Sequence, residues 1–129
     1  MDVIKKLEKI IPAIATKFGA IEVLYLFGSY ASGNASSESD VDIAVVVDEN
    51  RYKKDPLLDL RVGVVLEHEL ESDVDVVVMN RVSPIVQHEV LRSGKRLFER
   101  MPQRRAAFEL KSFKEYVDAR YYQRKRFYG

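Results

Sequence analysis

Cysteine is absent from the 129 residues of this sequence. Disulfide frameworks, thiolate zinc sites and cysteine nucleophiles are therefore excluded. Long apolar runs are lacking as well, because the longest have only a handful of residues and a bilayer-spanning helix needs ~20. The opening segment MDVIKKLEKI carries acids and has no apolar core followed by a cleavage site. We therefore expect no signal peptide, no membrane association and a cytoplasmic location.

The composition is that of one globular domain, with 47% hydrophobic and 32% charged residues. Its net charge of +1 hides an asymmetry along the chain. Residues 1–80 hold 8 Lys and Arg against 15 Asp and Glu, whereas residues 81–129 hold 13 against 5. This division indicates an acidic site in the first part and a basic surface in the second. It is equally compatible with two solvated faces of one domain.

Hydrophobic periodicity predicts alternating helices and strands, which is typical of an α/β fold with a small mixed sheet of three to four strands flanked by helices. Expected strands are rich in β-branched residues, and expected helices repeat apolar residues every three or four positions. The strands are predicted at 21–27, 41–47, 73–79 and 95–99, the helices at 2–18, 56–70, 84–92 and 103–128, and polar loops at 32–39 and 48–55.

Local signals refine the helix boundaries. Pro12 should kink the first helix or divide it into two pieces. Asp55 before Pro56, and Ser83 before Pro84, are cap-plus-proline signals for helix starts, and Gly94 is a predicted C-cap. In the helix at 56–70, the apolar residues expected to pack on the sheet include Leu57, Leu60 and Val64.

The residues that indicate chemistry lie at the ends of strands. Ten residues separate Gly28-Ser29, after the first strand, from Asp40-Val41-Asp42, at the start of the second. Asp40 and Asp42 are two apart and project from one face, and Asp73 and Asp75 repeat this pattern on the third strand. Clustered carboxylates suit Mg²⁺, which prefers a few carboxylates together with substrate phosphates.

Gly28 and Ser29 indicate a phosphate site. Without a Cβ, Gly28 lets a phosphate approach the backbone, and the N–H groups of a following turn can bind it. The Ser29 hydroxyl adds a donor. Phosphates held opposite metal-binding carboxylates are the arrangement that metal-assisted nucleotidyl transfer requires.

The segment GSYASGNASSESDVDIAVVV resembles the signature of the DNA polymerase β-type nucleotidyltransferase superfamily, and VDVVVMNRVSPIVQHEVLRSGKRLFER is similar to its minimal nucleotidyltransferase (MNT) branch. The resemblance implies the polymerase β-like fold, with Gly28 and Ser29 on the nucleotide β- and γ-phosphates. It implies that Asp40 and Asp42 bind two Mg²⁺ ions. A third acid would join one metal and help to deprotonate the attacking hydroxyl; we prefer Asp75 to Asp73, because Asp75 lies further into the apolar part of its strand.

One departure from the family pattern concerns the triphosphate. The family usually has an arginine at the place of Tyr30 or Ser32, and neither is basic here. Arg51, Lys53 or Lys54, from the loop after the second strand, are candidates to replace that contact.

Other polar residues carry weaker signals. Asn80 and Arg81 follow the third strand and are candidate nucleotide contacts. His68 and His88 are expected on helices, in surface or packing roles. The segment 101–129 mixes cations with aromatic residues, which fits RNA binding, a partner-binding helix or a terminal helix packed on the nucleotidyltransferase domain at 1–100.

The MNT resemblance implies the antitoxin of a toxin–antitoxin pair, which transfers AMP from ATP to a tyrosine of a HEPN-domain ribonuclease toxin. Two alternatives stay open: nucleotidyl transfer to a small molecule or RNA, and a non-catalytic antitoxin that neutralises its toxin by contact. The sequence also leaves a homo-oligomer open.

Overall fold

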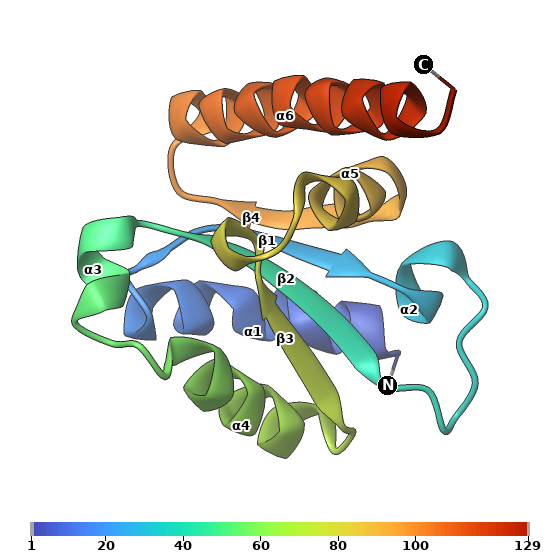
Figure 1. Ribbon diagram of the computed structural model, residues 1–129. Coiled ribbons are helices and arrows are strands. Elements are labelled where there is room, and N and C mark those ends of the chain that lie inside the picture. The colour runs from blue at the N-terminus through green and yellow to red at the C-terminus, as the bar shows by residue number, and fades with distance from the viewer. Residues whose placement is uncertain (1, 129) are drawn as a thin grey trace.

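The computed structural model describes residues 2–128, and side chains from Asp2 to Lys125. Helices and strands alternate along most of the chain (Figure 1). The helices are α1 (Val3–Lys17), α2 (Ser29–Ser32), α3 (Glu49–Lys53), α4 (Leu58–Leu70), α5 (Pro84–Ser93) and α6 (Pro102–Tyr128), with a 3₁₀ turn at Met79–Arg81; the strands are β1 (Ile21–Phe27), β2 (Val41–Val47), β3 (Val74–Val78) and β4 (Lys95–Glu99).

The four strands form one mixed sheet in the order β3-β2-β1-β4. Strand β1 is antiparallel to both β2 and β4, whereas β2 and β3 are parallel. Helices α1 and α4 cover one face, and α5 and α6 cover the other (Figure 1). The predicted fold class, a small mixed sheet flanked by helices, is confirmed.

Side chains alternate between two cores along the central strands. Val41, Ile43 and Val45 of β2 pack into the larger core, under α1 and α4. Ala44 and Val46 of the same strand pack into the smaller core, with α5 and the start of α6. Asp42 falls in the second set, because alternate residues of a strand share a face. Asp42 of the predicted site therefore projects to the side of the sheet that α5 and α6 cover.

Helix α1 is not divided at Pro12, so that part of the prediction is wrong. Pro12 lies inside one continuous helix, on its exposed side. Its missing N–H leaves the carbonyl of Glu8 without the usual partner, but Glu8 is exposed too, so water can hydrate that carbonyl. Burial of Leu7, Ile11 and Ile14 on the opposite side holds both halves of the helix on the sheet.

Helix α4 begins later than expected and turns a different face to the core. Its N-cap is Leu57 and not Asp55, which instead forms a 2.6 Å ion pair with Arg61. Leu57, Leu60 and Val64 were expected to pack on the sheet, but each is about 60% exposed. This helix is apolar around most of its circumference, so its sequence did not define the packed face; the buried residues are Leu58, Val62, Gly63, Leu66 and Leu70.

Two predicted boundaries are confirmed and one loop is not. The Ser83 Oγ accepts a hydrogen bond from the Val86 N–H and caps α5, which ends at Gly94. Gly94 is needed for space, because a Cβ there would lie 3.1 Å from the Leu26 carbonyl oxygen. The expected loop at 48–55 contains α3, because the Asp48 carboxylate accepts hydrogen bonds from the N–H groups of Asn50 and Arg51.

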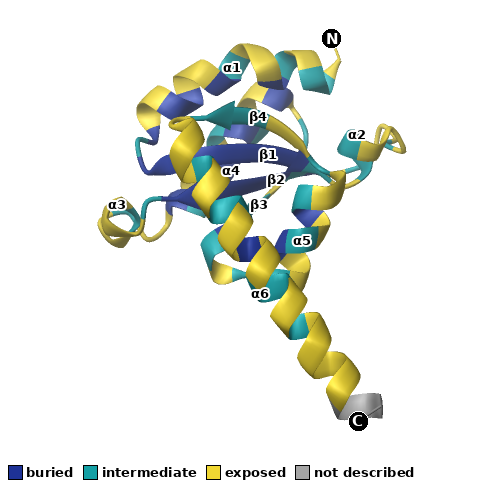
Figure 2. Ribbon diagram, turned by 90° about the horizontal axis from the view of Figure 1, so that it is seen from above, coloured by how far each residue is buried: buried dark blue, intermediate teal, exposed yellow. Residues whose placement is uncertain are grey.

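The first third of α6 is fixed to the sheet, as expected for a helix packed on its own domain. Arg104 forms a 2.9 Å ion pair with the buried Glu22. The Tyr25 hydroxyl donates a 2.7 Å hydrogen bond to Glu109, and burial together with this carboxylate raises the pKa of Tyr25. The rest of α6 extends beyond the sheet and is largely exposed (Figure 2). In the part of the chain described, no helix is both long and apolar enough to cross a membrane.

Candidate active site

The turn after β1 is built around Gly28. Gly28 has φ +73° and ψ −152°, a conformation that residues with a Cβ rarely adopt. Its carbonyl accepts hydrogen bonds from the N–H groups of Ala31 and Ser32, at 3.2 and 3.1 Å, which starts the short helix α2. The first N–H groups of a helix have no partner within it. The backbone at Ser29 and Tyr30 therefore presents donors at the end of the sheet.

Gly28 also lies directly against the carboxylate of Asp42, the acid in β2. A Cβ built on Gly28 would overlap the Oδ2 of Asp42 and lie 3.0 Å from its Cγ. The turn and the carboxylate thus occupy adjoining space that only a residue without a side chain permits. The predicted pairing of Gly28-Ser29 with the Asp40-x-Asp42 motif is realised as direct proximity.

Two acids face each other across the parallel strands. Asp42 of β2 is the register partner of Asp75 of β3, and Phe27 of β1 is the partner of Asp42 on the other side. Register partners project from the same face of a sheet. Asp42 is half-buried, while Asp75 and Asp40 are exposed.

The charges of Asp75 and Asp40 act on the carboxyl of Asp42. Burial raises the pKa of the Asp42 carboxyl, and the negative charges of Asp75 and then Asp40 raise it further. A cation near these oxygens would remove both the repulsion and part of the desolvation cost. Mg²⁺ is commonly held by one or two carboxylates plus substrate phosphates and water, so this set of hard oxygen ligands fits it. No three acidic, histidine or cysteine side chains among the described residues form a complete metal site by themselves.

Asp73, the other candidate for the third acid, lies just before β3, beside a hollow that Asp40 also lines. Its carbonyl accepts a 2.9 Å hydrogen bond from the Val41 N–H, which aligns the starts of β2 and β3. Its side chain lines an open acidic hollow of about 660 Å³ beside the site. The hollow is lined by Ser37, Glu38, Ser39, Asp40, Glu67, Glu71, Ser72 and Asp73.

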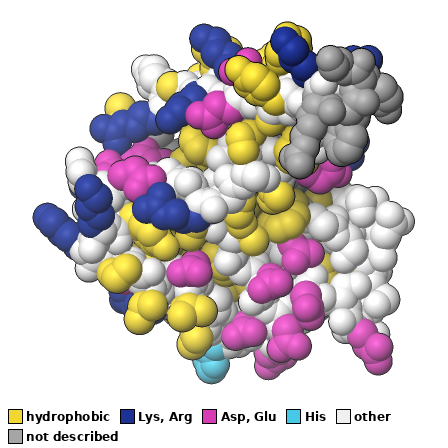
Figure 3. Space-filling view, in the orientation of Figure 1, with side chains coloured by type: hydrophobic (Ala, Val, Ile, Leu, Met, Phe, Trp, Pro, Cys, Tyr) yellow, Lys and Arg dark blue, Asp and Glu magenta, His cyan; other side chains and the backbone are white. Residues whose placement is uncertain are grey.

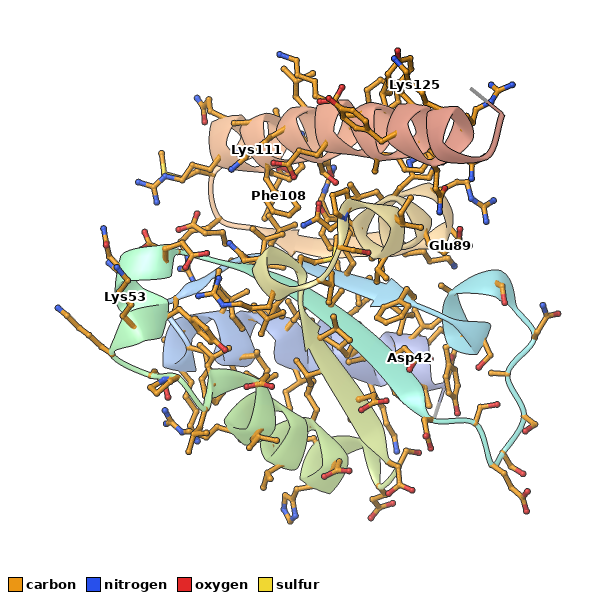
Figure 4. All side chains as sticks on the ribbon, viewed as in Figure 1. Asp42, Lys53, Glu89, Phe108, Lys111 and Lys125 are labelled. Carbon is orange, nitrogen blue, oxygen red and sulfur yellow. The ribbon has the colours of Figure 1, made fainter. Side chains whose placement is uncertain are left out.

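The cations expected to replace the missing arginine lie at the wrong end of the sheet. Lys53 and Asp42 are at opposite ends of β2 (Figure 4). Six residue steps of a strand span about 20 Å. Arg51 is engaged elsewhere, donating from Nη1 to the Gly19 carbonyl at 3.3 Å. The proposal that Arg51, Lys53 or Lys54 contacts the triphosphate is therefore wrong.

Asn80 and Arg81 lie at this same distant end, so their predicted nucleotide contact is also wrong. The Asn80 side chain makes two hydrogen bonds with the backbone of Val47, where β2 ends. Arg81 forms a paired contact with Glu49, with both distances 2.9 Å. Parallel strands that both start at the site must end away from it, so a residue that follows β3 cannot reach the nucleotide.

The histidines have the predicted roles. His68 is exposed on α4. His88 of α5 stacks on Tyr116 of α6, with ring centroids 3.6 Å apart, which joins the two helices.

One supporting residue was missed from the sequence. The Glu67 carboxylate, on α4, accepts a 3.2 Å hydrogen bond from the Val74 N–H at the start of β3. This bond positions the residue next to Asp75. No spacing signal could have found it, because Glu67 has the sequence context of an ordinary exposed helix residue.

Comparison with known proteins decides the family. The sequence profile of the family described as "Polymerase beta, Nucleotidyltransferase" matches residues 8–103. The chain belongs to this nucleotidyltransferase family. It is 35% identical over 103 residues to the protein adenylyltransferase MntA of Aphanizomenon flos-aquae, covering 74% of this chain and 69% of that protein. It is 32% identical over 90 residues to the MntA of Shewanella oneidensis, covering 70% and 63%.

Solved structures of similar proteins cover almost the whole chain. A chain of a toxin–antitoxin crystal structure with AMP-PNP matches with a TM-score of 0.74 and 27% identity, over 92% of this chain and 93% of that one. A chain of the complex of tri-AMPylated Shewanella oneidensis HEPN toxin with MNT antitoxin matches with a TM-score of 0.70 and 25% identity, over 96% and 93%. Together with the MntA relatives, these matches identify the minimal nucleotidyltransferase branch of the family.

Proposed function

We propose that this nucleotidyltransferase transfers AMP from ATP to a tyrosine hydroxyl of a HEPN-domain toxin, with Mg²⁺ as cofactor, and so acts as an antitoxin. The observation that carries the proposal is the contact of the Gly28 turn with the Asp42 carboxylate, beside Asp75. This arrangement provides a phosphate-binding turn and a set of cation ligands within one small region. The MntA relatives named as protein adenylyltransferases support a protein acceptor.

Each residue has a specific role in the proposed reaction. The backbone N–H groups after Gly28, with the Ser29 hydroxyl, bind the β- and γ-phosphates and orient the triphosphate. Asp40, Asp42 and Asp75 would hold two Mg²⁺ ions, which supply charge stabilisation for the attacking and leaving oxygens. Asp75 accepts the proton of the acceptor hydroxyl. A bond then forms between that oxygen and the α-phosphorus, and the α–β bridge bond breaks to release pyrophosphate.

The direct test is mass spectrometry of the acceptor. The protein is incubated with Mg²⁺, ATP and a HEPN-domain toxin as acceptor, and each transferred AMP should add about 329 Da to a toxin tyrosine. The modification is covalent, so inhibition of the ribonuclease should persist after the nucleotidyltransferase is removed. A toxin that gains no mass, but is inhibited while bound, would instead support a non-catalytic antitoxin. Modification of added RNA or of a small molecule would support the other alternative.

A further inference from the structure

Helix α6 carries an exposed apolar stripe that its own domain does not cover. Leu110, Phe113, Val117 and Tyr121 are between 47% and 57% exposed. Their spacing of three, four and four residues places them along one side of a helix. We call these four residues the α6 stripe. Contiguous exposed apolar surface of this kind marks interaction sites in soluble proteins.

The opposite side of α6 is the one that packs on the domain. Ser112 is 2% exposed, Phe108 joins the smaller core, and Tyr116 stacks on His88. At 100° per residue, Phe108 and Ser112 lie across the helix from the α6 stripe, and Tyr116 lies between the two sides. The stripe therefore faces away from the molecule and is available to another one.

Helix α6 runs toward the catalytic end of the sheet. It contacts β1 first through Arg104 and Glu22 and then, further along both elements, through Glu109 and Tyr25. Gly28 lies about 10 Å beyond Tyr25 along β1. The residues from Phe113 to Tyr121 lie about 6–18 Å beyond Glu109 along α6, which leaves the sheet obliquely (Figures 1 and 2).

The stripe and the catalytic acids also share one side of the sheet. Asp42 alternates with Ala44 and Val46, which pack toward α5 and α6. A protein of domain size that rests on α6 would thus meet the site from the side where its acids project.

The charged residues around the α6 stripe indicate the chemistry of the molecule that would bind there. Residues 110–125 hold five Lys and Arg against two acids. Lys114, Arg120 and Arg124 are exposed and border the stripe. Cations gather along α6 and acids over the lower part of the same view (Figure 3). Two copies of α6 packed by their stripes would bring like charges together, which disfavours self-association.

We propose that the α6 stripe docks an amphipathic helix of the protein that accepts AMP, with apolar side chains against the stripe and acidic residues beside Lys114, Arg120 and Arg124. This inference rests on the proposed function, because it assumes a protein acceptor. It assigns substrate recognition to α6 and leaves chemistry to the strands. Docking on α6 then supplies the acceptor-binding surface that the small nucleotidyltransferase domain lacks.

A second apolar surface provides a matched control. The α4 patch, Leu57, Leu60 and Val64, is about as exposed as the stripe. It borders a hollow with Lys17 and Phe18, where α1 ends and before β1 begins, and so lies at the opposite end of β1 from Gly28. A partner seated there would not reach the site.

The test compares three variants of the full chain with the wild type. Phe113→Gln with Val117→Gln removes the centre of the stripe without changing charge or helix propensity greatly. Leu60→Gln with Val64→Gln makes the same kind of change in the α4 patch. Asp42→Asn disables the site. For each, we would measure the dissociation constants for the HEPN-domain toxin and for RNA, the oligomeric state, the rate of AMP transfer to the toxin, and the thermal shift caused by Mg²⁺ and ATP.

We expect the stripe variant to bind the HEPN protein at least about 30-fold more weakly, with an unchanged thermal shift. Its transfer rate should recover at saturating acceptor, because KM rises and kcat does not. The α4 variant should match the wild type. Asp42→Asn should bind normally and transfer nothing.

Other outcomes separate the two proposals. Normal binding by the stripe variant, with transfer intact in the wild type, overturns docking on α6 and leaves the proposed function standing. Binding that depends on the stripe, but without transfer by the wild type, overturns the proposed function alone. A wild-type dimer that the stripe variant dissociates would identify a second copy as the occupant, and loss of RNA binding alone would identify RNA; either result overturns the docking proposal.

Discussion

At the scale of single residues, the candidate site depends on Gly28 and Asp42 sharing one small volume. Gly28 has a conformation that disfavours side chains, and a Cβ there would meet the Asp42 carboxylate. Gly33 offers a comparison, because it also has a positive φ, +81°, but nothing lies within 4 Å of its Cβ position. Substitutions at the two glycines therefore distinguish the effect of backbone strain alone from the effect of strain combined with displacement of Asp42.

Gly28→Ala should abolish most AMP transfer and lower the free energy of unfolding by about 1–3 kcal/mol, because it combines strain with displacement of Asp42. Gly33→Ala should cost about 1 kcal/mol through strain and retain transfer. Chemical denaturation and the mass-based transfer assay measure the two effects. Equal activity in the two variants would show that the contact with Asp42 has no functional importance.

Asp42→Asn should stabilise the protein in the absence of divalent cations. The folded state raises the pKa of Asp42 above its ordinary value of 3.8, so this carboxyl destabilises the fold increasingly as the pH rises through the raised pKa. Water screens the exposed part of the group, so the gain in melting temperature at pH 7 should be a few degrees at most. Melting curves from pH 3 to 8 should show the gain vanishing below about pH 4. A variant that is less stable than the wild type at pH 7 would contradict the repulsion of the Asp42 carboxylate by Asp75 and Asp40.

The third acid is tested by a pair of variants. Asp75→Asn should reduce AMP transfer by several orders of magnitude, because Asp75 is the register partner of Asp42. Asp73→Asn should keep most of the activity, since Asp73 lies just before β3 and is not the register partner of Asp42. Single-turnover rates at saturating ATP and acceptor give the comparison. The reverse order of rates would assign the role to Asp73.

Short-range patterns of the sequence predicted that Gly28 lies near Asp42 and that Asp42 and Asp75 share one face of the sheet, and the structure places these residues so. Their roles in binding and catalysis stay predictions. Arg51 and Asn80 could not be placed in this way. Their distance from Gly28 depends on the direction in which β2 and β3 run, and a list of strands without a topology does not contain that information.

At the scale of elements, α1 shows a helix maintained by tertiary packing against its own local preference. Pro12 removes one hydrogen bond on the exposed side, while the buried side supplies the stabilisation. Pro12→Ala should restore an N–H donor to the Glu8 carbonyl. We expect the free energy of unfolding to rise by about 1–2 kcal/mol, with AMP transfer unchanged. Denaturant titration measures the free energy of unfolding. A variant that is less stable than the wild type would indicate that proline is favourable at position 12.

The elements themselves were largely predictable, and their packed faces were not. Strand β4 has the predicted bounds, and β1 and β2 match theirs, because β-branched runs between polar segments are strong local signals. Helix α4 has apolar residues on several sides, so only the position of the sheet decides that Val62 is buried and Val64 exposed. The short α3 was missed because a five-residue helix has almost no periodicity.

At the scale of the whole molecule, the charge asymmetry of the sequence becomes a spatial one. Acids line the hollow beside the candidate site, and cations follow α6 (Figure 3). The sequence indicated an acidic part and a basic part. Only the fold shows how these charges are divided: Asp42 projects to the side of the sheet that α6 covers, whereas Glu67 and Glu71 of the hollow belong to α4 and its C-cap, on the other face.

The position of β3 gives Asp75, and Asp73 just before the strand, a second consequence, for solubility. β3 is an outer strand of the sheet and is otherwise made of valine. Unpaired outer strands with high β-propensity tend to pair with other chains, and charged residues prevent this. Asp73→Asn combined with Asp75→Asn should therefore increase aggregation on mild heating, as light scattering would show, whereas Asp40→Asn combined with Asp42→Asn, on an inner strand, should not. Asp75, the carboxylate proposed to serve chemistry, would then also limit the pairing of β3 with other chains.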